Sequence, residues 1–332
     1  MILTWIKFIA CLLIIVFAGR QVARYGDIIA EKTGIGGMWI GLILLSIVTS
    51  LPELFTGISA VALVGAPDLT AGNLIGANAF NLFNLALLDI ASRNPLVTEA
   101  SKGHVLPAGL SMVLVACVAA GIFVSSFSDL NIGWIGIYTP IIFLLYMFIM
   151  RIIFKRERRQ QAIIPQDVAL KHEHVSSRKA YLFFAISAVF IIGAGIWLAF
   201  IGEEIATITG WGESFVGSLL LAFATTLPEI TVSFSALRLG AVDMCIANMI
   251  GSNMFNMTII GIVDLIYTQG PILSAVSQSH IFTASIVLIM TGVFIAGLIF
   301  RPQHKTPLRA GWYSLVLIPL FVFGAYTSFT MA

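Results

Sequence analysis

The sequence predicts an all-α membrane protein with ten transmembrane helices, arranged as two inverted five-helix repeats. Three observations predict this fold: an apolar composition, a one-sided distribution of basic residues and an internal repeat. Of the 332 residues, 59% are hydrophobic and only 10% are charged, and the mean hydropathy is +1.00. A soluble domain carries about a quarter charged residues, so this composition indicates a chain that lies in a bilayer.

The apolar stretches are long enough for helices, because a helix needs roughly 20 residues to cross the hydrocarbon core. They are rich in glycine, which suits closely packed helices in lipid, and they lack the short alternating pattern of barrel strands. The expected spans are residues 3–19, 38–64, 69–90, 105–124, 133–153, 181–202, 212–237, 243–267, 281–300 and 311–330.

The basic residues predict how these spans are oriented. If the N-terminus lies outside, Lys7 is the only one of the 18 Lys and Arg residues that falls outside the cytoplasmic segments. The outward connections carry acidic residues alone, namely Asp68, Asp129, Glu203, Glu204 and Glu213. By the positive-inside rule, we expect a multi-pass protein of the cell inner membrane with both termini outside and the central loop in the cytoplasm.

The internal repeat joins two motifs. Ile-Val-Thr-Ser-Leu-Pro-Glu at 47–53 recurs as Phe-Ala-Thr-Thr-Leu-Pro-Glu at 223–229, and Asn-Leu-Ile-Gly-Ala-Asn-Ala-Phe-Asn at 73–81 recurs as Asn-Met-Ile-Gly-Ser-Asn-Met-Phe-Asn at 248–256. Each half contains an odd number of spans, so the halves have opposite orientations, as in many secondary transporters. The expected divisions are a first half at 1–154 with its repeat at 38–90, a cytoplasmic basic linker at 155–179, and a second half at 180–332 with its repeat at 212–267.

Two glutamates lie in the middle of predicted spans, at Glu53 and Glu229. An ionised carboxylate at this depth costs several kcal/mol unless it is paired. No Lys or Arg lies at a matching depth, so a bound cation is the simplest source of positive charge. A protonated glutamate that is hydrogen-bonded inside the bundle is the alternative. The occurrence of two glutamates at equivalent positions of an inverted repeat favours the cation.

Oxygen-bearing residues accompany both glutamates. Helical spacing places Ser46, Thr49 and Ser50 on the face of Glu53, and the second copy has Ala222, Thr225 and Thr226. Pro52 and Pro228 lack the N–H that would bond the carbonyl four residues earlier, so each helix is expected to bend and free a backbone oxygen. Such an all-oxygen set suits a hard cation such as calcium, and the absence of mid-span histidines argues against a soft transition metal.

The asparagine motif is expected to supply the facing wall of this site. Asparagine in a membrane more often joins helices than binds ions. Next to the symmetric glutamates, we expect Asn81, Asn256 and Ser252 to contribute to the site, and Asn78 and Asn253 to bond the broken backbone. Asp89 and Asp264 lie near span ends and are expected at the membrane interface.

Thr-Ser-Leu-Pro-Glu at 49–53, followed by Gly-Ala-Asn-Ala-Phe-Asn at 76–81 and repeated in inverted form, resembles the repeats of the sodium/calcium exchangers within the calcium/cation antiporter superfamily. The resemblance implies ten helices, a midplane site and alternating access by sliding of the first helix of each half. It also implies that Glu53 and Glu229 bind both calcium and sodium. The further sodium ligands that it implies are Thr49, Ser50, Thr225, Thr226, Ser252 and the backbone oxygens of Ser46 and Ala222.

Two positions depart from the family pattern. Ala77 stands where the family usually has a serine, while its counterpart Ser252 is kept, so one sodium site is expected to be weakened. Asn256 stands where several prokaryotic members have an aspartate, which leaves two carboxylates in the pocket.

The function that we predict is secondary antiport of calcium against sodium, with no cofactor and no nucleic-acid partner. The alternative is a proton/calcium exchanger, or an exchanger of another divalent cation. An intramembrane enzyme is disfavoured because all five histidines fall at span ends or in loops. A passive cation channel would differ from an antiporter in lacking coupled counterflow.

Overall fold

The computed structural model describes residues 2–33, 40–128, 130–161, 176–238 and 240–331. Eight of its helices are long and apolar enough to cross a membrane. They are α1 (Ile2–Thr33), α5 (Pro67–Ala91), α7 (Val105–Ser125), α8 (Tyr138–Gln161), α9 (Ser177–Thr209), α13 (Val242–Ile266), α14 (Ser279–Phe300) and α15 (Trp312–Met331). Two further spans are bent, and together with them the bundle has the ten transmembrane helices that the sequence predicts.

Each bent span consists of four short helical pieces. The first contains η1 (Ile40–Leu45), α3 (Ser46–Thr49), α4 (Leu51–Ser59) and η2 (Ala60–Val64). The second contains α10 (Glu213–Phe215), η4 (Val216–Leu221), α11 (Ala222–Thr225) and α12 (Leu227–Arg238). The spans bend by 43° and 41° at the single residues between α3 and α4 and between α11 and α12. Short connections complete the fold: α6 (Leu96–Glu99), η3 (Lys102–His104), η5 (Ile272–Ser274) and an antiparallel pair of strands, β1 (Asn131–Ile132) and β2 (Ile135–Gly136).

Some helix ends differ from the sequence prediction. The first helix was expected to end at residue 19, but α1 continues to Thr33, because a helix needs no apolar surface where it leaves the bilayer. The expected linker at 155–179 is shorter at both ends, since α8 reaches Gln161 and α9 begins at Ser177. Its central part, 162–175, lies outside the described residues.

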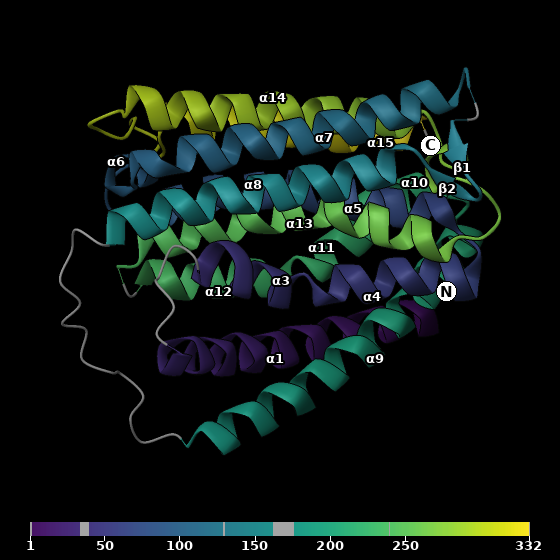
Figure 1. Ribbon diagram of the computed structural model, residues 1–332, viewed down its shortest axis with the longest axis horizontal. Coiled ribbons are helices and arrows are strands. Elements are labelled where there is room, and N and C mark those ends of the chain that lie inside the picture. The colour runs from purple at the N-terminus through teal and green to yellow at the C-terminus, as the bar shows by residue number, and fades with distance from the viewer. Residues whose placement is uncertain (1, 34–39, 129, 162–175, 239, 332) are drawn as a thin grey trace.

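The long helices run side by side, with α1 and α9 together along one edge and α7, α14 and α15 along the opposite edge (Figure 1). Helices α5 and α13 lie between these layers and are buried over most of their length. This burial fits their composition, because their asparagines would be costly against lipid. We call the end of the bundle that carries α6 and the last residue of α12 the basic end, since Arg24, Arg93, Lys102 and Arg238 belong to the segments there.

Glycines let helix backbones touch in the centre of the bundle. A side chain at Gly76 of α5 would overlap the backbone of Ser218 in η4, and one at Gly251 of α13 would overlap the backbone of Leu42 in η1. The edge helices meet the two bends in the same way. Gly19 of α1 lies against Pro228, and Gly195 of α9 lies against the backbone of Pro52. Each edge helix therefore contacts the bend that belongs to the other half.

Two buried aspartates join the halves near the ends of the bundle. Asp89 accepts hydrogen bonds from the Leu96 and Gly311 amides, at 2.8 and 2.7 Å, from the Ser314 hydroxyl at 2.7 Å, and from the Tyr313 hydroxyl. All but Leu96 belong to the second half. Asp89 lies near the end of α5, as expected from its place near a span end, and the structure adds that it is buried between the halves.

Asp264 repeats this arrangement at the other end. It accepts hydrogen bonds from the amides of Ile272 and Gly136, at 2.7 and 2.9 Å, and from the hydroxyls of Tyr138 and Thr139, at 2.8 and 2.6 Å. Both aspartates are fully buried, which is possible because every carboxylate oxygen has donors. Together they connect the two halves at both ends of the bundle.

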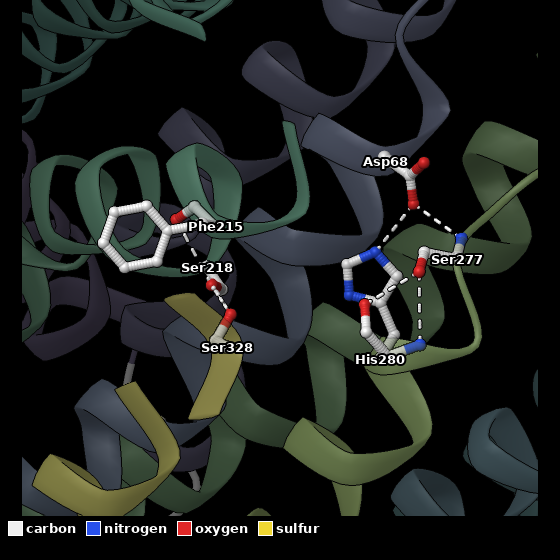
Figure 2. Close-up of polar contacts among 7 residues, drawn as sticks. Asp68, Phe215, Ser218, Ser277, His280 and Ser328 are labelled. Atoms are coloured by element: carbon white, nitrogen blue, oxygen red, sulfur yellow. Dashed lines mark hydrogen bonds and ion pairs between the residues drawn. The ribbon is translucent and has the colours of Figure 1, made fainter. Parts of the chain in front are cut away.

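A second symmetric pair of contacts lies at the first turns of α5 and α13. Asp68 accepts a hydrogen bond from the Ser277 amide at 2.7 Å and lies 2.9 Å from His280 Nε2, as Figure 2 shows. At the basic end, Asp243 Oδ1 lies 2.6 Å from the Ser101 amide and 2.8 Å from His104 Nε2. Each carboxylate again bonds residues of the opposite half.

Candidate functional site

The site begins at the two bends, which have the same chemical cause. Pro52 and Pro228 are the second residues of α4 and α12, and a proline there cannot donate a hydrogen bond to the carbonyl of Val48 or Ala224. Ser50 and Thr226 lie at the bends with non-helical backbone angles. The predicted bends are thus present, at the positions where the first motif is repeated.

Glu53 and Glu229 lie in the first turns of α4 and α12 and are completely buried. Glu229 Oε1 accepts a hydrogen bond from Ser50 at 3.0 Å and a longer one from Ser252 at 3.4 Å, whereas its Oε2 has no partner among the described residues. Neither carboxylate oxygen of Glu53 has a partner in the same part of the chain.

Four asparagines connect α5 to α13. The side-chain amides of Asn78 and Asn253 donate to each other's backbone carbonyls at 3.2 and 3.4 Å. Their side-chain oxygens accept from Asn256 and Asn81, each at 3.0 Å. Asn78 and Asn253 were expected to bond the backbone broken at the bends, but their amides donate to carbonyls of α5 and α13, and their oxygens orient Asn256 and Asn81.

That orientation has a chemical consequence for Asn81 and Asn256. Both donate their amide hydrogens to the asparagine cluster, and their oxygens, Oδ1, have no partner among the described residues. With three carboxylate oxygens of Glu53 and Glu229, the structure therefore contains five buried acidic or amide oxygens that accept no hydrogen bond from those residues.

The hydroxyls and backbone oxygens predicted for the site surround the bends. Thr49 Oγ1 lies 3.5 Å from Ser252 Oγ and 3.4 Å from the Ser46 carbonyl oxygen. Thr225 Oγ1 lies 3.4 Å from the Ala222 carbonyl oxygen, to which Thr226 also donates at 2.8 Å. The structure thus links Ser46 and Ser252 through Thr49, and links Ala222 with both threonines of the second bend.

The two halves of the site are not equivalent, and sequence differences explain why. Ser252 donates to Glu229, but its counterpart in the first half is Ala77, which has no hydroxyl to donate to Glu53. Similarly, Asn248 donates to Ser233 at 3.2 Å, but Gly57 stands at the equivalent position, 176 residues earlier (233 minus 57). The corresponding nitrogen of Asn73 consequently has no partner among the described residues.

The importance of Gly57 and Ser233 was missed at the sequence level. Continuing the repeat alignment a few residues beyond the glutamates would have revealed this difference. The effect of Gly57 on Asn73 could be found only from the structure, because it depends on which side chain packs against Asn73.

This arrangement suits a hard cation. A buried acceptor without a donor is unfavourable, and carboxylate and amide oxygens are the ligands that such ions prefer. Two fully buried carboxylates are also stabilised by a positive charge that neutralises them. Among the described residues there is no group of three or more His, Cys, Asp and Glu side chains that could hold a metal ion, so a cation at the two glutamates would also need amide, hydroxyl or backbone oxygens.

A family model for the sodium/calcium exchanger protein matches residues 3–152 and 179–331. The chain belongs to this family. It is 26% identical to the sodium/calcium exchanger MaX1 of Methanosarcina acetivorans, with coverage of 96% of this chain and 97% of the relative. It is also 26% identical to the inner membrane protein YrbG of Escherichia coli, with 82% of each chain covered.

Solved structures of this family have the same fold. The structure of the sodium-calcium exchanger NCX_Mj soaked with Na+ and Sr2+ matches with a TM-score of 0.66 at 21% identity, covering 97% of each chain. This likeness confirms the expected fold of ten membrane helices in inverted repeats. Family and fold together identify the chain as a membrane-embedded cation antiporter.

Proposed function

We propose that this antiporter exchanges calcium for sodium by alternating access, with Glu53 and Glu229 as the shared ion ligands. One observation carries the proposal: both glutamates are fully buried at the bends, and three of their four oxygens are without hydrogen-bond donors among the described residues. Among the described residues, the Oδ1 atoms of Asn81 and Asn256 likewise accept no hydrogen bond. The names of MaX1 and NCX_Mj, which describe sodium/calcium exchangers, support this assignment.

The remaining ligands in the proposal are the hydroxyls and carbonyls around the bends. They are Ser46, Thr49, Ser50, Ala222, Thr225, Thr226 and Ser252. One calcium ion neutralises the two carboxylates, and sodium ions compete for the same oxygens. Because calcium and sodium then exclude each other at the glutamates, the two ions cross the membrane in separate steps, which is the basis of exchange.

We place the basic end of the bundle in the cytoplasm and both chain termini outside, because basic loops are retained on the cytoplasmic side. YrbG is named as an inner membrane protein, which supports the same location for this chain.

Proton/calcium exchange is the second candidate. It is favoured by Glu53, whose two oxygens accept no hydrogen bond from the described residues. A proton, like a sodium ion, would neutralise this side chain in the absence of calcium. The hydroxyls around both bends favour sodium, because a proton needs no such ligands.

The test is uptake of radiolabelled calcium into proteoliposomes loaded with sodium, with sodium, potassium or choline outside. Sodium/calcium exchange requires uptake that depends on the outward sodium gradient and persists when a proton ionophore is added. Uptake that ignores sodium and collapses with the proton gradient would replace the proposal with proton exchange. Uptake without any counterflow would indicate a channel.

A further inference from the structure

A cavity of about 720 Å3 lies between α1 and α12 at the basic end of the bundle. Its volume is in the range of small-molecule binding sites, which is about 300–1,000 Å3. Arg20 and Arg24 of α1 and Arg238 of α12 line it. The cavity lining contains no Asp or Glu among the described residues, so the charge there is positive.

The rest of the cavity wall is mostly apolar. Leu45, Ile230, Phe234 and Met244 contribute to it, and Arg238 lies over the ring of Phe234, with Cζ 5.5 Å from the ring centroid. Thr231 adds a hydroxyl. Positive charge at one end of an apolar cleft suits a ligand with an anionic head and a hydrocarbon body, and suits a hydrated metal cation poorly.

The position of the cavity follows from how α1 crosses α12. The two helices touch at Gly19 and Pro228, where an added Cβ would lie 2.7 Å from the proline ring. Beyond this contact, towards the basic end, the cavity is lined by Arg20 and Arg24 of α1 and by Ser235 and Arg238 of α12. The cavity therefore lies between α1 and α12 beyond their contact at Gly19, and Ile230, the residue after Glu229, is part of its lining.

The inverted repeat provides an internal comparison. Gly195 makes the contact equivalent to that of Gly19, at an offset of 176 (195 minus 19). At the same offset, Arg20, Arg24 and Arg238 correspond to Ile196, Phe200 and Ala62. The fold thus accepts apolar residues at all three positions, so packing does not require the arginines.

We propose that this cavity binds the phosphate headgroup of an anionic phospholipid. The three arginines bind the phosphate, and the apolar wall accommodates the adjoining hydrocarbon. Basic pockets between membrane helices on the cytoplasmic side are suited to such headgroups, and guanidinium groups match phosphate geometry closely. The apolar wall favours a lipid over a free phosphate ion, which has no hydrocarbon to bury.

The test is binding of phosphatidylglycerol to the purified full-length protein in detergent, measured by native mass spectrometry and by the shift in thermal unfolding. The variant combines Arg20→Gln, Arg24→Gln and Arg238→Gln. We expect it to bind phosphatidylglycerol about 100-fold more weakly, since each basic residue near an anionic lipid contributes about a fivefold factor. A control with the same loss of charge combines Arg151→Gln, Lys155→Gln and Arg178→Gln, at exposed positions outside the cavity lining, and should bind normally.

A second variant, Ser235→Phe, fills the cavity without changing the charge. Ser235 is exposed, so this substitution should leave the fold intact and still displace the lipid. Phosphatidylcholine should not compete. Equal binding by both triple variants would overturn the proposal. So would saturation of the site by inorganic phosphate with no added effect of the lipid. Neither measurement depends on which cations the protein exchanges.

Discussion

Two pairs of buried carboxylates lie within the same inverted repeats, yet their surroundings are opposite. Asp89 and Asp264 each accept four hydrogen bonds from backbone amides and hydroxyls. Glu53 accepts none from the described residues, and Glu229 accepts hydrogen bonds at only one oxygen. All four side chains have no solvent exposure. Burial alone therefore does not identify an ion site, whereas the supply of donors separates the two kinds of carboxylate.

The physical difference lies in where each charge is compensated. A hydrogen bond to a charged group contributes about 1.5–3 kcal/mol, so four donors stabilise an aspartate without any ion. Among the described residues the glutamates have no comparable set of donors, which fits the proposal that a bound cation compensates their charge. We therefore expect the aspartates to maintain the contact between the halves and the glutamates to transport, and the following predictions test this division from the largest expected effect to the smallest.

The largest effect is expected for Glu53→Gln and Glu229→Gln. In the proposed site each substitution removes one of the two negative charges that bind the ion, so calcium exchange should fall about 100-fold or more. The unfolding temperature should stay the same or rise, because an uncompensated buried charge is lost. Calcium flux and thermal unfolding of the purified variants measure both effects.

Glu203→Gln is the matched control, since this exposed glutamate lies outside the site. Near-normal exchange by Glu53→Gln or Glu229→Gln would contradict the assignment of that glutamate.

The opposite pattern is expected for Asp89→Asn and Asp264→Asn. An asparagine places an NH2 group against donors that need an acceptor, so stability should fall by about 2–4 kcal/mol. Thermal unfolding in detergent should show a lower midpoint, while calcium exchange per folded molecule changes little. Tyr313→Phe removes one donor and should cost about 1 kcal/mol. Loss of exchange without loss of stability would show that Asp89 belongs to the transport machinery.

A smaller effect is expected at the position that distinguishes the two glutamates. Ala77→Ser supplies a hydroxyl equivalent to that of Ser252 and should lower the sodium concentration for half-maximal exchange about fivefold, as expected for one added polar contact of about 1 kcal/mol. Ser252→Ala should raise it by a similar factor. The measurement is the sodium dependence of calcium efflux, and unchanged dependence in both variants would show that these positions do not contact sodium.

The smallest effect is expected for the carboxylates that are partly exposed. The side chains of Asp68 and Asp243 are 28% and 46% exposed, and each pairs with a buried histidine. Water stabilises such a carboxylate when its partner is removed, so Asp68→Asn and Asp243→Asn should each cost about 1 kcal/mol or less. Thermal unfolding of the purified variants measures this loss of stability. A loss as large as that of Asp89→Asn would show that solvent exposure does not determine how much each carboxylate contributes to stability.

The sequence predicted the ten spans and the region of the candidate site, for identifiable reasons. Apolar stretches of membrane length are typical of transmembrane helices, and a carboxylate in the middle of one is conspicuous against its neighbours. The repeated prolines predicted both bends. The predicted spans did not give the ends of the helices, because α1 and α8 continue beyond their apolar stretches into polar sequence.

The role of Asp89 and Asp264 in connecting the two halves could not be predicted from the sequence. Their donors at Gly311 and Gly136 are 222 residues later and 128 residues earlier in the chain, in the opposite half. A residue near a span end is usually interfacial, and only the packing of the halves shows that these two are buried.

By itself, the sequence determined what depends on composition and local spacing: membrane insertion, the inverted repeat, the helix bends and the types of oxygen near them. The tertiary structure decided which of these oxygens remain free. Whether Glu53 or Asp89 retains the capacity to bind an ion depends on the donors around it, and those come from helices of both halves. Because hydrogen-bond partners across the bundle are set by three-dimensional packing, the same residue type in the same repeat becomes either a structural link or a candidate ion ligand.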